Sequence, residues 1–119
     1  MKIELCSFGR KYGMPEADMV LDVRCLENPF WVPELKEKNG LDNEVRAYIL
    51  DRSQDYLEKL IQLLQLHGRL AGDRSCACLR IAVGCTGGRH RSVCVAQLLA
   101  EALREEFEVR LTHRDIDRG

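Results

Sequence analysis

The stretch from Leu79 to Val93 places the strongest constraint on what this chain can fold into. It begins as an apolar run, becomes a polar turn with glycines from Gly84 to His90, and resumes as a helical pattern near Arg91. A strand, a tight loop and a helix in this order form an anion site, because the first backbone N–H groups of the helix lack intrahelical partners and the helix dipole adds partial positive charge. The stretch therefore predicts a seat for a phosphate-bearing ligand.

The residue types within this loop favour the same interpretation. Gly87 and Gly88 allow backbone conformations that a Cβ would forbid, and they permit a close approach to a ligand. Arg89 and Arg91 add guanidinium groups, each of which can hold a phosphate through two hydrogen bonds. A glycine-rich turn that serves packing alone is the alternative. The predicted anion loop consists of Cys85, Thr86, Gly87, Gly88, Arg89, His90, Arg91 and Ser92.

The apolar periodicity alternates between strands and helices along the chain. The predicted strands span residues 2–8, 19–24, 79–83 and 107–111, and the predicted helices span 43–50, 53–67 and 91 to about 106. Asp42 is a candidate helix cap, Gly68 a candidate helix stop, and residues 69–75 a polar loop. Phe30 and Trp31 are expected to be buried against the core. Together these elements predict a single α/β domain over residues 1–119, a three-layer, mainly parallel open sheet of about four strands with covering helices.

Ligands of such sheets bind outside the carboxyl ends of the strands. Three polar loops are expected at this edge, at residues 9–13, 22–28 and 84–92. Asp22 and Arg24 either face the ligand or pair with each other in solvent. The two additional loops contribute the candidate ligand-binding residues Arg10, Lys11, Tyr12, Asp22, Arg24 and Asn28.

Composition narrows the class of partner. The net charge of −1 argues against coating nucleic acid by charge alone. The first residues lack the apolar core of a signal peptide and no run is long enough to span a membrane, so a cytoplasmic protein without membrane contact is expected. Only one residue separates Cys76 from Cys78, which is shorter than zinc-ligand spacing, and the six cysteines are expected to be free thiols. Neither a metal nor a cofactor is therefore predicted.

The spacing of Cys85 and Arg91 indicates a second possible function for the loop, in catalysis. Five residues separate them and Ser92 follows, which is the C-x5-R-[ST] spacing of cysteine-dependent phosphatases. A helix N-terminus with nearby cations would lower the pKa of such a nucleophile. Position 84, however, is glycine where those phosphatases usually have histidine, and only Asp22 or Glu34 can be suggested as a general acid. Phosphatase activity stays an alternative, and a protein that is not an enzyme is favoured.

Three longer segments carry a more specific resemblance. They are Ser7-Phe-Gly-Arg-Lys-Tyr-Gly13, Asp22-Val-Arg24 followed by Asn28-Pro29, and Gly84-Cys-Thr-Gly-Gly-Arg-His-Arg-Ser-Val93. In this order they resemble the SFGxKYG, D-V-R-x-L-x-N-P and GCTGG[KR]HRSV segments of the C-terminal domain of the RapZ (RNase adapter protein, YvcJ-like) family. The resemblance implies a parallel α/β fold similar to a phosphofructokinase subdomain and a pocket for glucosamine-6-phosphate. In some members it also implies binding of a small RNA that is presented to an RNase.

The chain departs from this family at three places. Members usually carry an N-terminal nucleotide-binding domain with a Walker A loop, whereas this chain has no G-x4-G-K-[ST]. Phe30 stands where some RNA-binding members have histidine, and aspartates dilute the basic tail from Thr112 to Gly119. We therefore expect a module that senses a sugar phosphate and relays the presence of this ligand to a protein partner, to RNA or to a second copy of the chain. An RNA-binding adaptor and the phosphatase remain the alternatives.

Overall fold

The computed structural model describes residues 1–118 of the 119-residue chain. The strands in this part are β1 (Lys2–Gly9), β2 (Met19–Asp22), β3 (Cys78–Cys85) and β4 (Glu108–His113). The helices are α1 (Asn43–Asp73) and α2 (Arg91–Leu103), with the short 3-10 turns η1 (Arg10–Tyr12) and η2 (Pro29–Trp31). The predicted α/β fold is confirmed.

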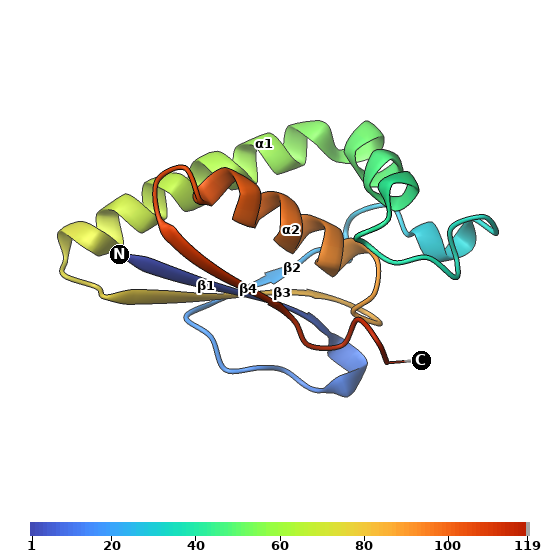
Figure 1. The fold of residues 1–119 in the computed structure, drawn as a ribbon, viewed down its shortest axis with the longest axis horizontal. Helices are drawn as coiled ribbons and strands as arrows, with labels where there is room; N and C mark the ends of the chain where they lie inside the picture. The colour runs from blue at the N-terminus through green and yellow to red at the C-terminus, as the bar shows by residue number, and fades with distance from the viewer. Residues whose placement is uncertain (119) are drawn as a thin grey trace.

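The four strands form one parallel sheet in the order β2-β3-β1-β4. Helices α1 and α2 lie together on one face of this sheet, and the connection that contains η1 lies on the other (Figure 1). The apolar side chains between the helices and the sheet are fully buried. They include Ile3, Leu5, Ile49, Leu64, Ile81, Val83, Leu99 and Leu103.

The two central strands, β1 and β3, determine where a ligand site can form. β1 and β3 are neighbours, and Gly9 at the end of β1 pairs in register with Cys85 at the end of β3. After β1 the chain turns to η1 on one face, whereas after β3 it turns to α2 on the other (Figure 1). Neighbouring strands whose connections leave in opposite directions open a crevice at their carboxyl ends.

The predicted break between two helices before β3 is present, but the predicted end of the second helix was wrong. α1 runs from Asn43 to Asp73 as two helical segments that meet at a kink, where Ser53 has a non-helical φ of −135° and ψ of 20°. Gly68 does not end the helix. It is one of the buried residues of α1, and the ring of Phe107 occupies the space where a side chain at position 68 would lie. Asp42 precedes the helix but forms no side-chain cap, since its carboxylate accepts the N–H of Asn39 at 2.8 Å instead.

The two glycines of α1 give a matched pair of stability predictions. A Cβ at Gly68 would lie 2.7 Å from Cζ of Phe107, so Gly68→Ala is expected to destabilise the fold by about 1–3 kcal/mol through overpacking. A Cβ at Gly72 would meet only Met1 at 4.0 Å, so Gly72→Ala is expected to stabilise by up to about 1 kcal/mol. Urea unfolding midpoints of both variants check this, and equal shifts in one direction would contradict it.

The expectation that Phe30 and Trp31 are buried was also wrong. Their side chains are 41% and 77% exposed, and the rings meet edge to face with centroids 5.1 Å apart. Pro29 is the buried member of η2 and anchors the turn. Two exposed aromatic rings consequently stand at a pocket rather than in the core, with Nζ of Lys36 4.9 Å from the centroid of the Phe30 ring.

Several boundaries of the strands differ from the predictions. β2 ends at Asp22 because the carboxylate of that residue accepts the N–H of Arg24 at 3.0 Å, which turns the chain. Cys85 belongs to the end of β3 rather than to the loop, and β4 continues through His113 into the expected tail.

Three predictions from composition can be compared with the described residues. All six cysteines there are free thiols. Within residues 1–118, no helix has both the length and the hydropathy needed to cross a lipid bilayer. In the same part of the chain no three side chains of histidine, cysteine, aspartate or glutamate gather as metal ligands.

Candidate functional site

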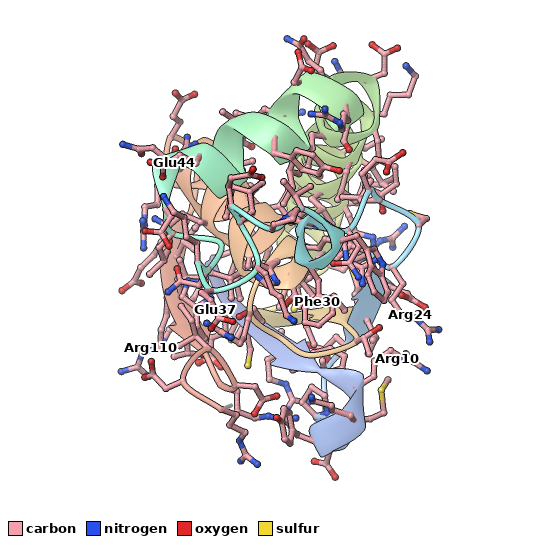
Figure 2. The ribbon with its side chains drawn as sticks, turned by 90° about the vertical axis from the view of Figure 1, so that its right-hand side faces the viewer. Arg10, Arg24, Phe30, Glu37, Glu44 and Arg110 are labelled. Atoms are coloured by element: carbon pink, nitrogen blue, oxygen red, sulfur yellow. The ribbon has the colours of Figure 1, made fainter. Side chains whose placement is uncertain are left out.

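A pocket of about 370 Å³ lies where the crevice between β1 and β3 is expected. The predicted ligand-binding residues that line it are Lys11, Asn28, Cys85, Thr86, Gly87, Arg89, His90 and Arg91. Phe30, Trp31 and Arg118 line it as well. In Figure 2, which looks onto this end of the molecule, Phe30 lies between the segment of η2 and the end of β1.

The lining carries charge of one sign. Lys11, Arg89, Arg91 and Arg118 contribute four cations, and among residues 1–118 no aspartate or glutamate lines the pocket. α2 begins at Arg91 beside it, and the first N–H groups of a helix lack intrahelical partners. Cations, backbone donors and the positive end of a helix dipole converge, so the pocket is suited to an anion.

Arg91 is held rigidly although it is charged. Its side chain is only 6% exposed, and Nη1 donates to the carbonyl oxygens of Arg24 at 2.9 Å and Leu26 at 3.2 Å. These bonds use one terminal nitrogen. The guanidinium is thus fixed at the pocket by the loop that follows β2, with Nε and Nη2 outside these two contacts.

The thiol of Cys85 sits at the base of the anion loop. Its Sγ donates to Oγ of Ser92 at 3.1 Å and accepts the N–H of Gly88 at 3.3 Å. Cys85 and Ser92 are both buried. These contacts close the loop on itself, and they bring together the cysteine and the serine of the C-x5-R-[ST] spacing.

The two glycines of the loop differ in what they require. Gly88 has φ +78°, and a Cβ there would lie 2.6 Å from the backbone nitrogen of Gly9 and 2.9 Å from Cβ of Asp115. Gly87 has no atom within 4 Å of such a Cβ. The conformational argument made from the sequence therefore holds for Gly88 but not for Gly87.

His90 adds a polar group without adding charge. Burial lowers the pKa of the imidazole, and the neighbouring Arg89 lowers it further, against a partial opposing effect of nearby backbone carbonyls. The side chain is 7% exposed, and Nε2 has no hydrogen-bond partner in the described part of the chain. At neutral pH the ring is consequently a neutral donor and acceptor at the pocket wall.

Asp22 and Arg24 lie outside the lining and pair with each other. Nη2 of Arg24 is 2.7 Å from Oδ2 of Asp22, and Nε is 3.0 Å from Oδ1. This hydrogen bonding lowers the pKa of Asp22 to about 2. Both side chains are exposed, and in Figure 2 Arg24 and Arg10 point outward along one side of the molecule. From the loop after β2, the backbone carbonyl oxygens of Arg24 and Leu26 reach Arg91, and Asn28 lines the pocket.

The remaining predicted residues surround the lining. Tyr12 carries two cations on its ring, with Nζ of Lys11 at 5.2 Å and the guanidinium of Arg118 at 4.8 Å from the centroid. Gly88 and Ser92 shape the loop through the contacts above.

Two residues of the C-terminal segment were missed by the sequence analysis. Arg118 lines the pocket, and the fully buried Asp115 forms an ion pair with it at 3.0 Å. The only signal in the sequence was an arginine three residues after an aspartate in a mixed-charge tail. That pattern is ordinary on protein surfaces and did not single them out.

The sequence of this chain was compared with protein families and with known proteins, and it matches one family over nearly its whole length. The sequence model of the RapZ C-terminal domain matches residues 1–117. A nucleotide-binding protein of Desulforapulum autotrophicum is 50% identical over 99% of this chain, and one of Lactobacillus delbrueckii subsp. bulgaricus is 49% identical over 98%. A third, from Pelobacter propionicus, is 47% identical over 100% of the chain.

The match covers this chain but only part of each relative. It spans 42%, 41% and 43% of the lengths of these three proteins, respectively. The shared part contains all three sequence segments that meet at the pocket, at the ends of β1, β2 and β3. The chain therefore belongs to the RapZ C-terminal domain family.

Proposed function

We propose that this domain binds and senses a phosphorylated small molecule, a sugar phosphate such as glucosamine-6-phosphate, in the pocket at the ends of β1 and β3. The observation that supports it best is the lining, where four cations face a volume of about 370 Å³ without a carboxylate among the described residues. Pockets for small molecules begin at roughly 300 Å³. Phe30 and Trp31 supply apolar surface for the body of the ligand beside the anion loop.

The rigidity of the site supports a sensing role. Arg91 of the anion loop donates to the backbone of the segment that follows β2, so an anion bound at Arg91 is coupled to that segment. Exposed groups there, including the ring of Trp31, are available to a protein partner or a second copy. The relatives are named nucleotide-binding proteins, and a nucleotide shares the phosphate but is larger than a sugar phosphate.

A thermal-shift series tests the proposal. Glucosamine-6-phosphate is expected to raise the melting temperature in a concentration-dependent way, because a ligand that binds only the folded state adds RT ln(1 + [L]/Kd) to its stability. Glucosamine without phosphate is the matched control and should give no shift. The shifts produced by adenosine nucleotides and by inorganic phosphate show whether the pocket prefers a nucleotide or phosphate alone to a sugar phosphate. No shift with any phosphorylated compound would contradict the proposal.

A phosphatase is the second candidate function, because the thiol of Cys85 lies within the loop where a nucleophile would be needed. We nevertheless predict that Cys85 is not a catalytic nucleophile. Its thiol is positioned by Ser92 and Gly88, whereas no carboxyl group among the described lining residues can protonate a leaving group. Wild-type protein is therefore expected to release no phosphate from p-nitrophenyl phosphate. Turnover that is present in the wild type and absent in Cys85→Ser would show that the phosphatase reading is right.

For the RNA-binding alternative we predict weak, non-specific affinity. Arg114 of the C-terminal segment is engaged by Asp115 and by the carbonyl oxygen of Gly13, which reduces the cations free for phosphate contacts. With a net charge of −1, the expected Kd for structured RNA is about 10⁻⁴–10⁻⁶ M at physiological salt. Fluorescence anisotropy over a salt series measures it. Submicromolar binding to one hairpin, with much weaker binding to a scrambled control, would favour an RNase adaptor instead.

A further inference from the structure

The C-terminal segment after β4 is tied to the end of β1. The N–H of Arg114 donates to the carbonyl oxygen of Ser7 at 3.0 Å, and the carboxylate of Asp115 accepts the N–H of Gly9 at 2.7 Å. Asp115 is 0% exposed. A buried carboxylate is costly unless it is paired and hydrogen-bonded, so this anchor holds the segment in a defined place.

Two arginines compensate the charge of Asp115, and they differ in what else they do. Nη2 of Arg114 lies 2.9 Å from Oδ2 of Asp115 and also donates to the carbonyl oxygen of Gly13 at 2.7 Å. Arg114 is thus occupied with structure. Arg118 instead approaches Oδ1 of Asp115 through Nε at 3.0 Å, which leaves its terminal nitrogens outside that contact.

The position of Arg118 relative to the pocket is the decisive observation. Its guanidinium stacks on the ring of Tyr12, with 4.8 Å to the centroid, and it lines the pocket together with Lys11, Arg89 and Arg91. Asp115 on one side and Tyr12 on the other orient a cation that belongs to the last residues of the described chain.

We propose that Arg118 is a ligand-binding residue of this pocket, contacting an anionic group of the bound molecule, and that Asp115 is its positioning residue. The inference rests on the proposed function, because it adds a cation from the C-terminal segment to the same anion site. It also makes that segment part of the binding site. Burial by itself would raise the pKa of Asp115, but hydrogen bonds from Arg114 and from the N–H of Gly9 outweigh it, so the carboxylate is charged at neutral pH.

Calorimetric titration with glucosamine-6-phosphate and with inorganic phosphate tests the role of Arg118. Arg118→Gln is expected to raise Kd about three- to tenfold for at least one probe, since a charge-assisted contact is lost at a partly exposed position. Arg118→Lys should raise Kd by a smaller factor, because lysine keeps the positive charge. Arg104→Gln is the matched control, an exposed arginine at the far end of α2, and should leave Kd unchanged within about twofold.

A double-mutant cycle tests the role of Asp115. Asp115→Asn should weaken binding in the wild type but add little in the Arg118→Gln background, because two residues that act through one contact are not additive. Full additivity would reduce Asp115 to a structural residue. Should Asp115→Asn fail to fold, the Arg118 variants still decide the main proposal, since Arg118 is an exposed side chain.

The outcomes separate this inference from the proposed function. If the wild type binds and Arg91→Ala loses affinity while Arg118→Gln does not, only the role of Arg118 is overturned. If the wild type binds neither probe, the proposed function fails and this inference fails with it.

Discussion

Arg91→Ala is expected to weaken the binding of glucosamine-6-phosphate by about 10- to 150-fold, or about 1.5–3 kcal/mol, the range for a hydrogen bond to a charged group. The effect is expected to be large because Arg91 is buried at the pocket and fixed by two backbone carbonyls, so that a bound phosphate meets a preorganised cation. Isothermal titration calorimetry at fixed salt measures it. An unchanged Kd would rule out the assignment of the anion loop.

A loss of fold must be distinguished from a loss of binding in this variant. Removing the guanidinium leaves the carbonyl oxygens of Arg24 and Leu26 without this donor, which is expected to lower stability by about 1–3 kcal/mol. Urea unfolding of the same sample shows whether the variant is folded at the titration temperature. Arg104→Ala removes an arginine just beyond the other end of α2 and should change neither property appreciably.

The position of the loop between β3 and α2 could be predicted from sequence because its determinants are local. A strand, a glycine turn and a helix follow one another within the stretch from Leu79 to Val93, and the structure forms β3 and α2 around that turn. The carboxyl-edge rule then brings the loop after β1 to the same place, which the pairing of Gly9 with Cys85 bears out. Both steps need only element order and parallel topology.

The aromatic residues and the length of α1 could not be predicted because they depend on tertiary packing. Phe30 and Trp31 are large and apolar, which favours burial, yet the anchoring of Pro29 leaves them at the pocket. Gly68 has the local signature of a helix stop, but Phe107, which is distant in sequence, fills the space above it. At Gly68, a contact with a residue distant in sequence outweighed the local preference.

The paired charges near the pocket were assigned incompletely for two different reasons. Asp22 and Arg24 stand at the correct edge, but their mutual ion pair takes them out of the lining. Arg118 stands at the end of the chain, where sequence gives no register, and only the contact of Asp115 with the N–H of Gly9 brings it to the pocket. Sequence separation of 106 residues between these two partners is beyond any local rule.

Gly88→Ala is expected to destabilise the fold by about 2–5 kcal/mol and to abolish measurable phosphate binding. The residue has φ +78°, which costs a non-glycine residue roughly 1–2 kcal/mol. The added Cβ would also lie 2.6 Å from the backbone nitrogen of Gly9 and 2.9 Å from Cβ of Asp115, and relieving such overpacking costs about 1–3 kcal/mol more. Because the loops after β1 and β3 must separate to admit the methyl group, the N–H of Gly9 would also move away from the carboxylate of Asp115.

Gly87→Ala is the matched control, one residue earlier in the same loop. Its φ is not positive and a Cβ there meets no atom within 4 Å, so the free energy of unfolding should stay within about 0.5 kcal/mol of the wild type. Urea unfolding of the two variants side by side gives the comparison, and calorimetry with inorganic phosphate follows the binding. Equal stability of the two variants would mean that the close contact between Gly88 and Gly9 does not hold the anion loop, since this contact and the positive φ are what distinguish the two positions.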